Sequence, residues 1–164
     1  MTDHAVDHLR VELRACLAVP RWIDEVAARA PFTSVDDLLA AGREAANPLT
    51  DDEVSLALAD HPRIGDRPVG DGVAQQHSRA EQASLGADDE QLAAAIAEGN
   101  RAYEKRFDRV FLIRAAGRSR REILEELTRR IRLHDADEAI IVEQQLREIA
   151  LLRLEKMFGA GEKA

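Results

Sequence analysis

The sequence predicts an all-α fold, a single-domain bundle of about eight helices over residues 1–164. Helix-forming residues dominate, and Gly and Pro stand mostly between the periodic apolar segments, where they separate one helix from the next. Ser/Thr-x-x-Glu signatures mark helix starts. The only run typical of a strand, Val110 to Ile113, has no partner run elsewhere, so we expect a buried extended connector there.

The first half of the chain predicts four helices. The first is expected over about 5–18, and the second is a short helix that contains Trp22 and Val26 and ends before Pro31. The third begins at a Thr33 or Ser34 cap and runs to Asn47, and the fourth runs from Thr50 to near Asp60. Thr50 and Glu53 form a capping box, in which each side chain accepts from the other residue's backbone. Pro62 ends the fourth helix, because the residue before a proline is pushed out of the helical region.

The second half predicts a loop and four more helices. They are a loop over 63–73, helices over about 74–84 and 88–107, one from Ser119 to about Leu133, and a last one that stops at Gly159. Three glycines and a proline predict the loop. Ser119 with Glu122 forms a second capping box, and Asp135 with Glu138 predicts the same device before the last helix.

Composition excludes several classes of protein. The net charge of -8 disfavours a nucleic-acid surface, which usually carries clustered, uncompensated Lys and Arg. No apolar run reaches the roughly 20 residues of a membrane-spanning helix, and the start lacks the pattern of a secretory signal, so the cytosol is expected. Cys16 is the only cysteine, which excludes an internal disulfide and a Cys-rich metal site.

The stretch ADHPRIGD, residues 59–66, interrupts the helical pattern. Pro62 holds the backbone of His61 extended, and Gly65 allows a sharp turn. A histidine on a stiff loop is a candidate general acid or base, because imidazole transfers protons near neutral pH. Alternatively, His61 accepts a hydrogen bond at the helix end or lies in solvent.

A second candidate site follows in HSRAEQASL. Ser78 and Glu81 share one helix face, with Gln82 at its border. If that face is buried, its polar groups need partners, which a ligand would supply; the alternative is an ordinary solvated face. His77 and Glu81 are spaced i to i+4 and with His61 raise the question of a metal, but no ligand-dense motif is present, so we predict no metal site.

Arg153 interrupts an apolar stripe on the last helix. The stripe consists of Val142, Leu146, Ile149 and Met157. An arginine there either snorkels to solvent from near the helix end, or is buried and must meet a carboxylate or carbonyl. In the second case the partner could be an anionic substrate.

These residues together resemble the family of 2-oxo-4-hydroxy-4-carboxy-5-ureidoimidazoline (OHCU) decarboxylases, which complete the conversion of urate to allantoin. The resemblance runs over nearly the whole chain. Its strongest parts are HPRIGD at 61–66, Ser78 with Glu81 and Gln82, NRAYEKRFDRVFLIRAAGRS at 100–119, and EIALLRL at 148–154. Two positions depart from the family pattern: Asp108 stands where glycine is common at a helix end, and Ser84 where glycine or alanine is usual.

The resemblance implies a set of site residues. The catalytic histidine corresponds to His61 and its acidic partner to Glu81. The implied substrate-binding residues are Pro62, Ser78, Gln82, Arg153 and the segment Phe111, Leu112 and Ile113, whose backbone lines the pocket. Arg147 and Arg132 are neighbouring alternatives to Arg153.

The implied function is the cofactor-independent decarboxylation of OHCU to (S)-allantoin. The substrate is a small anion that serves as its own electron sink, so no metal, pyridoxal or thiamine is expected. A homodimer is plausible by the same resemblance. The alternatives are a lyase or hydrolase acting on another purine breakdown product, and a non-catalytic α-helical binding module.

Overall fold

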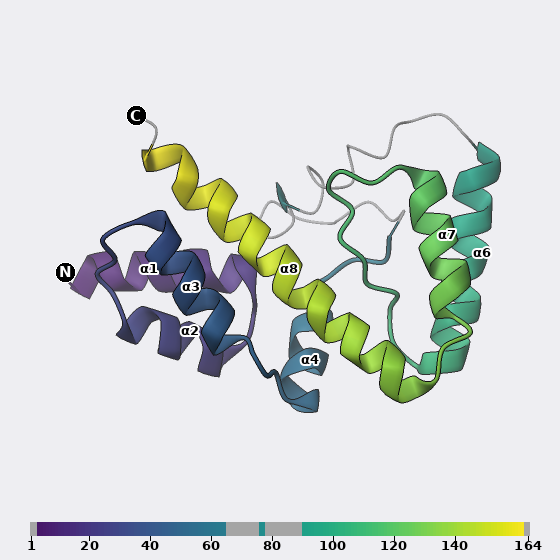
Figure 1. The fold of residues 1–164 in the computed structure, drawn as a ribbon, viewed down its shortest axis with the longest axis horizontal. Coiled ribbons are helices and arrows are strands. Elements are labelled where there is room, and N and C mark those ends of the chain that lie inside the picture. The colour runs from purple at the N-terminus through teal and green to yellow at the C-terminus, as the bar shows by residue number, and fades with distance from the viewer. Residues whose placement is uncertain (1–2, 65–75, 78–89, 163–164) are drawn as a thin grey trace. The chain divides into compact units, whose positions relative to one another are not determined.

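The computed structural model describes residues 3–64, 76–77 and 90–162 (Figure 1). In these ranges the chain forms helices and no strand, which confirms the predicted all-α class. The helices are α1 (Asp3–Cys16), α2 (Pro20–Ala28), α3 (Val35–Ala45), α4 (Asp51–Leu58), α6 (Glu90–Phe107), α7 (Arg120–Arg130) and α8 (Asp135–Glu162). Among them, none has the length and apolar character that a bilayer crossing requires.

The chain divides into two compact units. Unit 1 contains residues 1–57 and 146–164, and unit 2 contains residues 58–145. The long helix α8 contributes its first part to unit 2 and its last part to unit 1. The expectation of a single domain over residues 1–164 stays a prediction.

Unit 1 is built from α1, α2, α3, all but the last residue of α4, and the C-terminal part of α8. Helix α2 packs against both α1 and α3 (Figure 1). Trp22 is fully buried, and its indole N–H donates to the carbonyl of Gly42 at 2.9 Å. A Cβ at Gly42 would lie 2.9 Å from Cδ1 of Leu154, so the absence of a side chain allows α3 to approach α8 closely.

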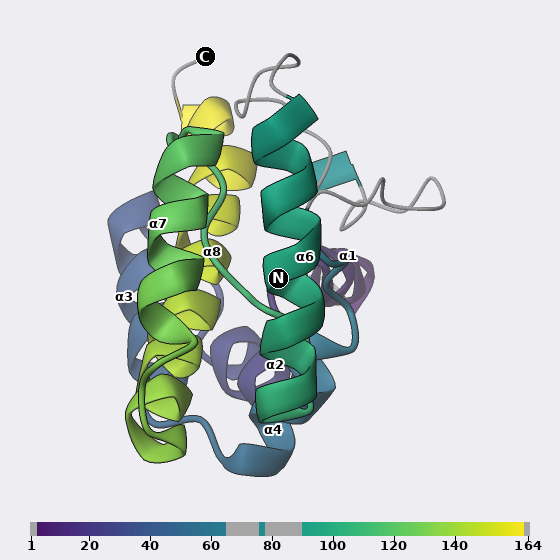
Figure 2. The ribbon, with the colours of Figure 1, turned by 90° about the vertical axis from the view of Figure 1, so that its right-hand side faces the viewer.

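Unit 2 is built around the pair α6 and α7, which lie side by side (Figures 1 and 2). A Cβ at Gly99 of α6 would lie 2.5 Å from Cδ2 of Leu127 of α7, which shows how closely the two helices approach. Their core contains the buried residues Ile64, Ile96, Tyr103, Phe111, Ile113, Ala115, Ile123 and Leu127. The predicted extended connector, Val110 to Ile113, is confirmed: it has no helical or strand structure, and its last three residues are buried.

Two predicted capping boxes are confirmed. Glu53 N–H donates to Thr50 Oγ1 at 3.1 Å, and Thr50 N–H donates to Glu53 Oε1 at 2.9 Å. Ser119 and Glu122 make the same reciprocal pair at the start of α7. Of the two expected caps for α3, Ser34 is the one used. Each box satisfies backbone donors that a helix start leaves without an intrahelical partner.

The predicted capping box of the last helix and its predicted end are wrong. Asp135 is already helical, and the carboxylate of Glu138 contacts Tyr103 and Arg130 instead of the helix start. Glu138 therefore has a tertiary contact where the sequence predicted a local one. The helix also continues through Gly159 to Glu162, because a glycine weakens a helix without forcing it to end.

Asp108 follows the last residue of α6 in a left-handed conformation, with φ at 56°. This conformation suits glycine and is tolerated by Asp better than by most residues. The helix end expected at Phe107–Asp108 is confirmed.

Candidate active site

His61 lies just beyond the end of α4. Its backbone N–H donates to the carbonyl of Leu58 at 3.0 Å, which closes the last turn of the helix. His61 and Pro62 are both half-buried, so the imidazole is not simply a solvated side chain at a helix end. The sequence predicted this arrangement from the proline, and the observed end of α4 at Leu58 agrees with it.

The loop after His61 is held against helix α6. The side-chain amide of Asn100 donates to the carbonyl of Ile64 at 2.8 Å. One turn further on, Glu104 accepts from Nε of Arg63 at 2.5 Å and from Nη2 at 2.9 Å. Hydrogen bonding from Arg63 lowers the pKa of the Glu104 carboxyl group, which therefore stays ionised at neutral pH. Both residues that follow Pro62 are thus fixed to the same helix.

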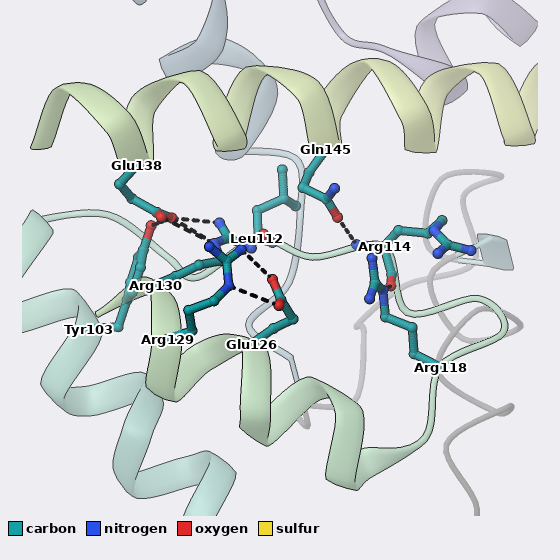
Figure 3. A network of polar contacts seen from close by, with 9 residues as sticks. All are labelled: Tyr103, Leu112, Arg114, Arg118, Glu126, Arg129, Arg130, Glu138 and Gln145. Carbon is teal, nitrogen blue, oxygen red and sulfur yellow. Dashed lines mark hydrogen bonds and ion pairs between the residues drawn. The ribbon is translucent and has the colours of Figure 1, made fainter. Parts of the chain in front are cut away.

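The segment Phe111–Ile113 is buried between α7 and the first part of α8 (Figure 3). Nη1 of Arg130 donates to the carbonyl of Leu112 at 2.9 Å. The backbone N–H of Arg114 donates to Oε1 of Gln145 at 2.8 Å. These two hydrogen bonds fix the backbone on either side of Ile113.

A buried ionic network supports this segment (Figure 3). Arg130 and Glu138 are both fully buried, and Nη2 of Arg130 lies 2.5 Å from Oε1 of Glu138. The same oxygen accepts from the hydroxyl of Tyr103 at 2.6 Å, and the guanidinium of Arg130 lies 4.6 Å from the ring centre of Phe111. Burial, together with the hydrogen bond to Glu138, raises the pKa of Tyr103 to about 12. The charges of the pair are satisfied inside unit 2, as buried charges must be.

The His61 loop and the Phe111–Ile113 segment belong to one core. Ile64, Phe111 and Ile113 are members of the same buried cluster. Unit 2 therefore brings together two of the predicted site segments. Ser78, Glu81 and Gln82 lie outside the described residues, so their predicted place in the site stays a prediction.

Arg153 belongs to unit 1 and is buried there, with 3% of its surface exposed. Nη1 donates to the carbonyl of Ala15 at 3.1 Å. Of the two alternatives, snorkelling is therefore wrong, and the buried guanidinium that meets a carbonyl is confirmed. The neighbouring Arg147 is only half-buried and donates to the carbonyl of Ala46 at 3.2 Å.

Sequence reasoning missed two buried polar residues that hold these segments, Asn100 and Arg130. Asn100 left a signal, because it interrupts the apolar series Ile96, Tyr103 and Phe107 on one face of α6. Arg130 left none, since it stands in the run TRRIR, where every arginine looks equally solvent-exposed. Within the described ranges, no group of three or more His, Cys, Asp or Glu side chains is placed to bind a metal ion.

Similar proteins share this architecture. A crystal structure of an OHCU decarboxylase in the presence of (S)-allantoin superimposes with a TM-score of 0.77 at 23% sequence identity, covering 91% of this chain and 98% of that one. A crystal structure of an (S)-allantoin synthase gives a TM-score of 0.65 at 15% identity, covering 92% of this chain and 50% of that one. At these identities the likeness establishes the all-α fold.

The sequence comparisons establish the family. The family model for OHCU decarboxylase matches residues 4–155, and the chain therefore belongs to the OHCU decarboxylase family. The uric acid degradation bifunctional protein TTL of Arabidopsis thaliana is 24% identical over 155 residues, which are 93% of this chain and 48% of that protein. The chain thus spans about half the length of this curated relative.

Proposed function

We propose that this chain catalyses the decarboxylation of OHCU to (S)-allantoin without a cofactor. The observation that carries the proposal is the match to the OHCU decarboxylase family over residues 4–155, a range that includes every candidate site residue. The half-buried His61 supports it, because the segment around it is held by hydrogen bonds at Leu58 and at Ile64. The cytosol as the compartment and a homodimer as the assembly stay predictions.

The substrate itself supplies much of the chemistry. It carries a carboxylate and a hydroxyl on one ring carbon and a C=N bond at the next. When the bond to the carboxylate breaks, CO₂ leaves and the electron pair passes to the adjacent C=N, whose nitrogen takes a proton. The protein must also remove the hydroxyl proton and add a proton to the neighbouring carbon. With the hydroxyl proton reused, the reaction consumes one proton from solvent for each CO₂ released.

His61 is the proposed base. In the proposal its imidazole takes the hydroxyl proton as the bond to CO₂ breaks, and Glu81 or the loop itself orients the ring. Delivery of a proton to one face of the neighbouring carbon sets the handedness of the product. General acid–base catalysis of this kind contributes about 10² to 10⁴ in rate.

The remaining candidate residues bind and orient the substrate. Ser78, Gln82 and Arg153 would contact the ureido and carbonyl groups. Arg153 is suited to this task because its planar guanidinium offers several donors in a fixed geometry. The backbone of Phe111–Ile113 would line the pocket, and its burial and attachment to Arg130 support that placement.

The rate of substrate loss tests the proposal. OHCU is generated in place with urate oxidase and hydroxyisourate hydrolase, and its decay is followed with and without this protein. We expect the wild type to accelerate the decay and His61→Asn to lose about 10² or more of that acceleration. His134→Asn is the matched control, because His134 is exposed at the start of α8. Equal rates of OHCU decay with the wild type and with His61→Asn would contradict the assignment of His61 as the base.

A further inference from the structure

Asn100 occupies an unusual position for an amide side chain. It is 1% exposed and lies on the face of α6 that also buries Ile96 and Tyr103. Its Nδ2–H group donates to the carbonyl of Ile64 at 2.8 Å. Ile64 is itself buried in the core of unit 2, so this hydrogen bond is shielded from water.

The other half of the amide makes no comparable contact. A carbonyl only accepts, so the NH₂ group must face Ile64 and Oδ1 must face away. Oδ1 of Asn100 is buried and has no hydrogen-bond partner in the structure as described. Leaving such an acceptor without a partner carries a desolvation cost, which offsets the gain from the bond to Ile64. An apolar side chain of the same shape would bury no unsatisfied acceptor of its own, but it would leave the buried carbonyl of Ile64 without its donor, so what Asn100 contributes here is its hold on Ile64.

We propose that Asn100 is a positioning residue for His61, an inference that rests on the proposed function. Only the backbone of residues 62 to 64 separates His61 from the carbonyl that Asn100 holds, and part of it is stiff. Asn100 fixes the carbonyl of Ile64, and the ring of Pro62 restricts the backbone between them. The hydrogen bond from His61 N–H to Leu58 fixes the opposite end of the loop.

The second contact of the loop is of a different kind. The side chains of Arg63 and Glu104 are 44% and 25% exposed, so solvent reaches their ion pair and salt screens it. The Asn100 bond is neutral and buried, so its geometry does not depend on salt or on the ionisation of Glu104. The hold of Asn100 on the loop is therefore independent of salt and of the charge on Glu104.

The test is Asn100→Leu, which removes the donor and keeps the branching of the side chain, with methyl groups larger than the amide oxygen and nitrogen. A small misplacement of a reacting group costs up to about 10²-fold in rate, so we expect kcat to fall about 10- to 100-fold. KM should stay within about threefold, because Asn100 binds the loop and not the substrate. The imidazole signals of His61 in NMR spectra, assigned with His61→Asn, should shift, and so should the pH at which they titrate.

The control for general destabilisation is Ile123→Val, which removes one methyl group from the same core. It should leave kcat and the His61 signals as in the wild type. If Asn100→Leu does not fold, Asn100→Ser replaces it, since its hydroxyl is too short to reach Ile64.

Two results would overturn the inference. One is unchanged kcat and unchanged His61 signals in the Asn100 variant. The other is an equal loss of kcat in Ile123→Val, which would reduce the effect to general destabilisation. The NMR measurement needs no turnover. If the wild type is inactive, the proposed function is contradicted, but the His61 signals still show whether Asn100 positions the loop.

Discussion

Individual residues that break a pattern carried most of the functional information. His61 stood out because a proline and a glycine interrupted the helices around it, and Arg153 because it interrupted an apolar stripe. Asn100 broke a stripe in the same way and was missed. Arg130 could not be found, because only tertiary packing distinguishes it from Arg129, which is exposed and pairs with Glu126.

Arg153→Ala tests whether the buried arginine binds substrate. Hydrogen bonds to a charged group contribute about 1.5–3 kcal/mol, so kcat/KM should fall at least about tenfold. The control is Arg147→Ala on the same helix, because Arg147 also donates to a carbonyl but is only half-buried. Its kcat/KM should stay within about threefold of the wild type. Unchanged kinetics in a folded Arg153→Ala protein would make this arginine structural.

Asp108 gives a prediction about stability. Its φ of 56° is strained for an L-residue by about 1–2 kcal/mol, and less for Asp than for most. Asp108→Gly removes the strain but adds disorder to the unfolded chain, so we expect a gain of up to about 1 kcal/mol. Asp108→Ala should instead lose stability. Urea unfolding of both variants measures the difference, and a more stable alanine variant would contradict the strain argument.

At the scale of the element, α6 connects both site segments of unit 2. Asn100 and Glu104 hold the loop after His61, while Tyr103 contacts Glu138, the partner of Arg130. Because α6 is a rigid helix, residues a turn apart keep a fixed spacing. The His61 loop and the Phe111–Ile113 segment therefore share one support.

The ionisation of Tyr103 can be measured without interference from other tyrosines, since it is the only tyrosine in the chain. It therefore tests whether the buried contacts of α6 are formed. Burial raises its pKa from 10.0 to about 12. The folded state therefore holds its proton more tightly than the unfolded state, so this stabilisation is complete below pH 10 and is lost as the pH rises towards 12. Tyrosinate absorbance should appear near pH 12. A midpoint near 10, with circular dichroism showing a folded protein, would contradict the buried network.

The helix boundaries show which local signals suffice and which do not. Two capping boxes, at Thr50 and at Ser119, were predicted correctly from four-residue patterns. The pattern at Asp135 and Glu138 looked the same, but the carboxylate of Glu138 is bound by Arg130 from another helix. A local pattern cannot reveal a stronger partner that is distant in sequence, so the third box was wrong.

At the scale of the molecule, the sequence was sufficient for the all-α class and for the family. Periodicity and capping identify helices because both depend on neighbouring residues. The contacts that fix the site segments, Asn100 to Ile64 and Arg130 to Leu112, join residues far apart in sequence and could not be derived from periodicity.

The stereochemistry of the product distinguishes enzymatic decarboxylation of OHCU from its spontaneous decay. OHCU is generated in place, this protein is added, and circular dichroism follows the allantoin that forms. We expect rapid growth of the (S)-allantoin signal beyond the slow racemic background, with His61→Asn returning to that background. Growth of the signal no faster than the background, with the wild-type protein shown to be folded, would contradict the proposed decarboxylation and the function assigned to His61.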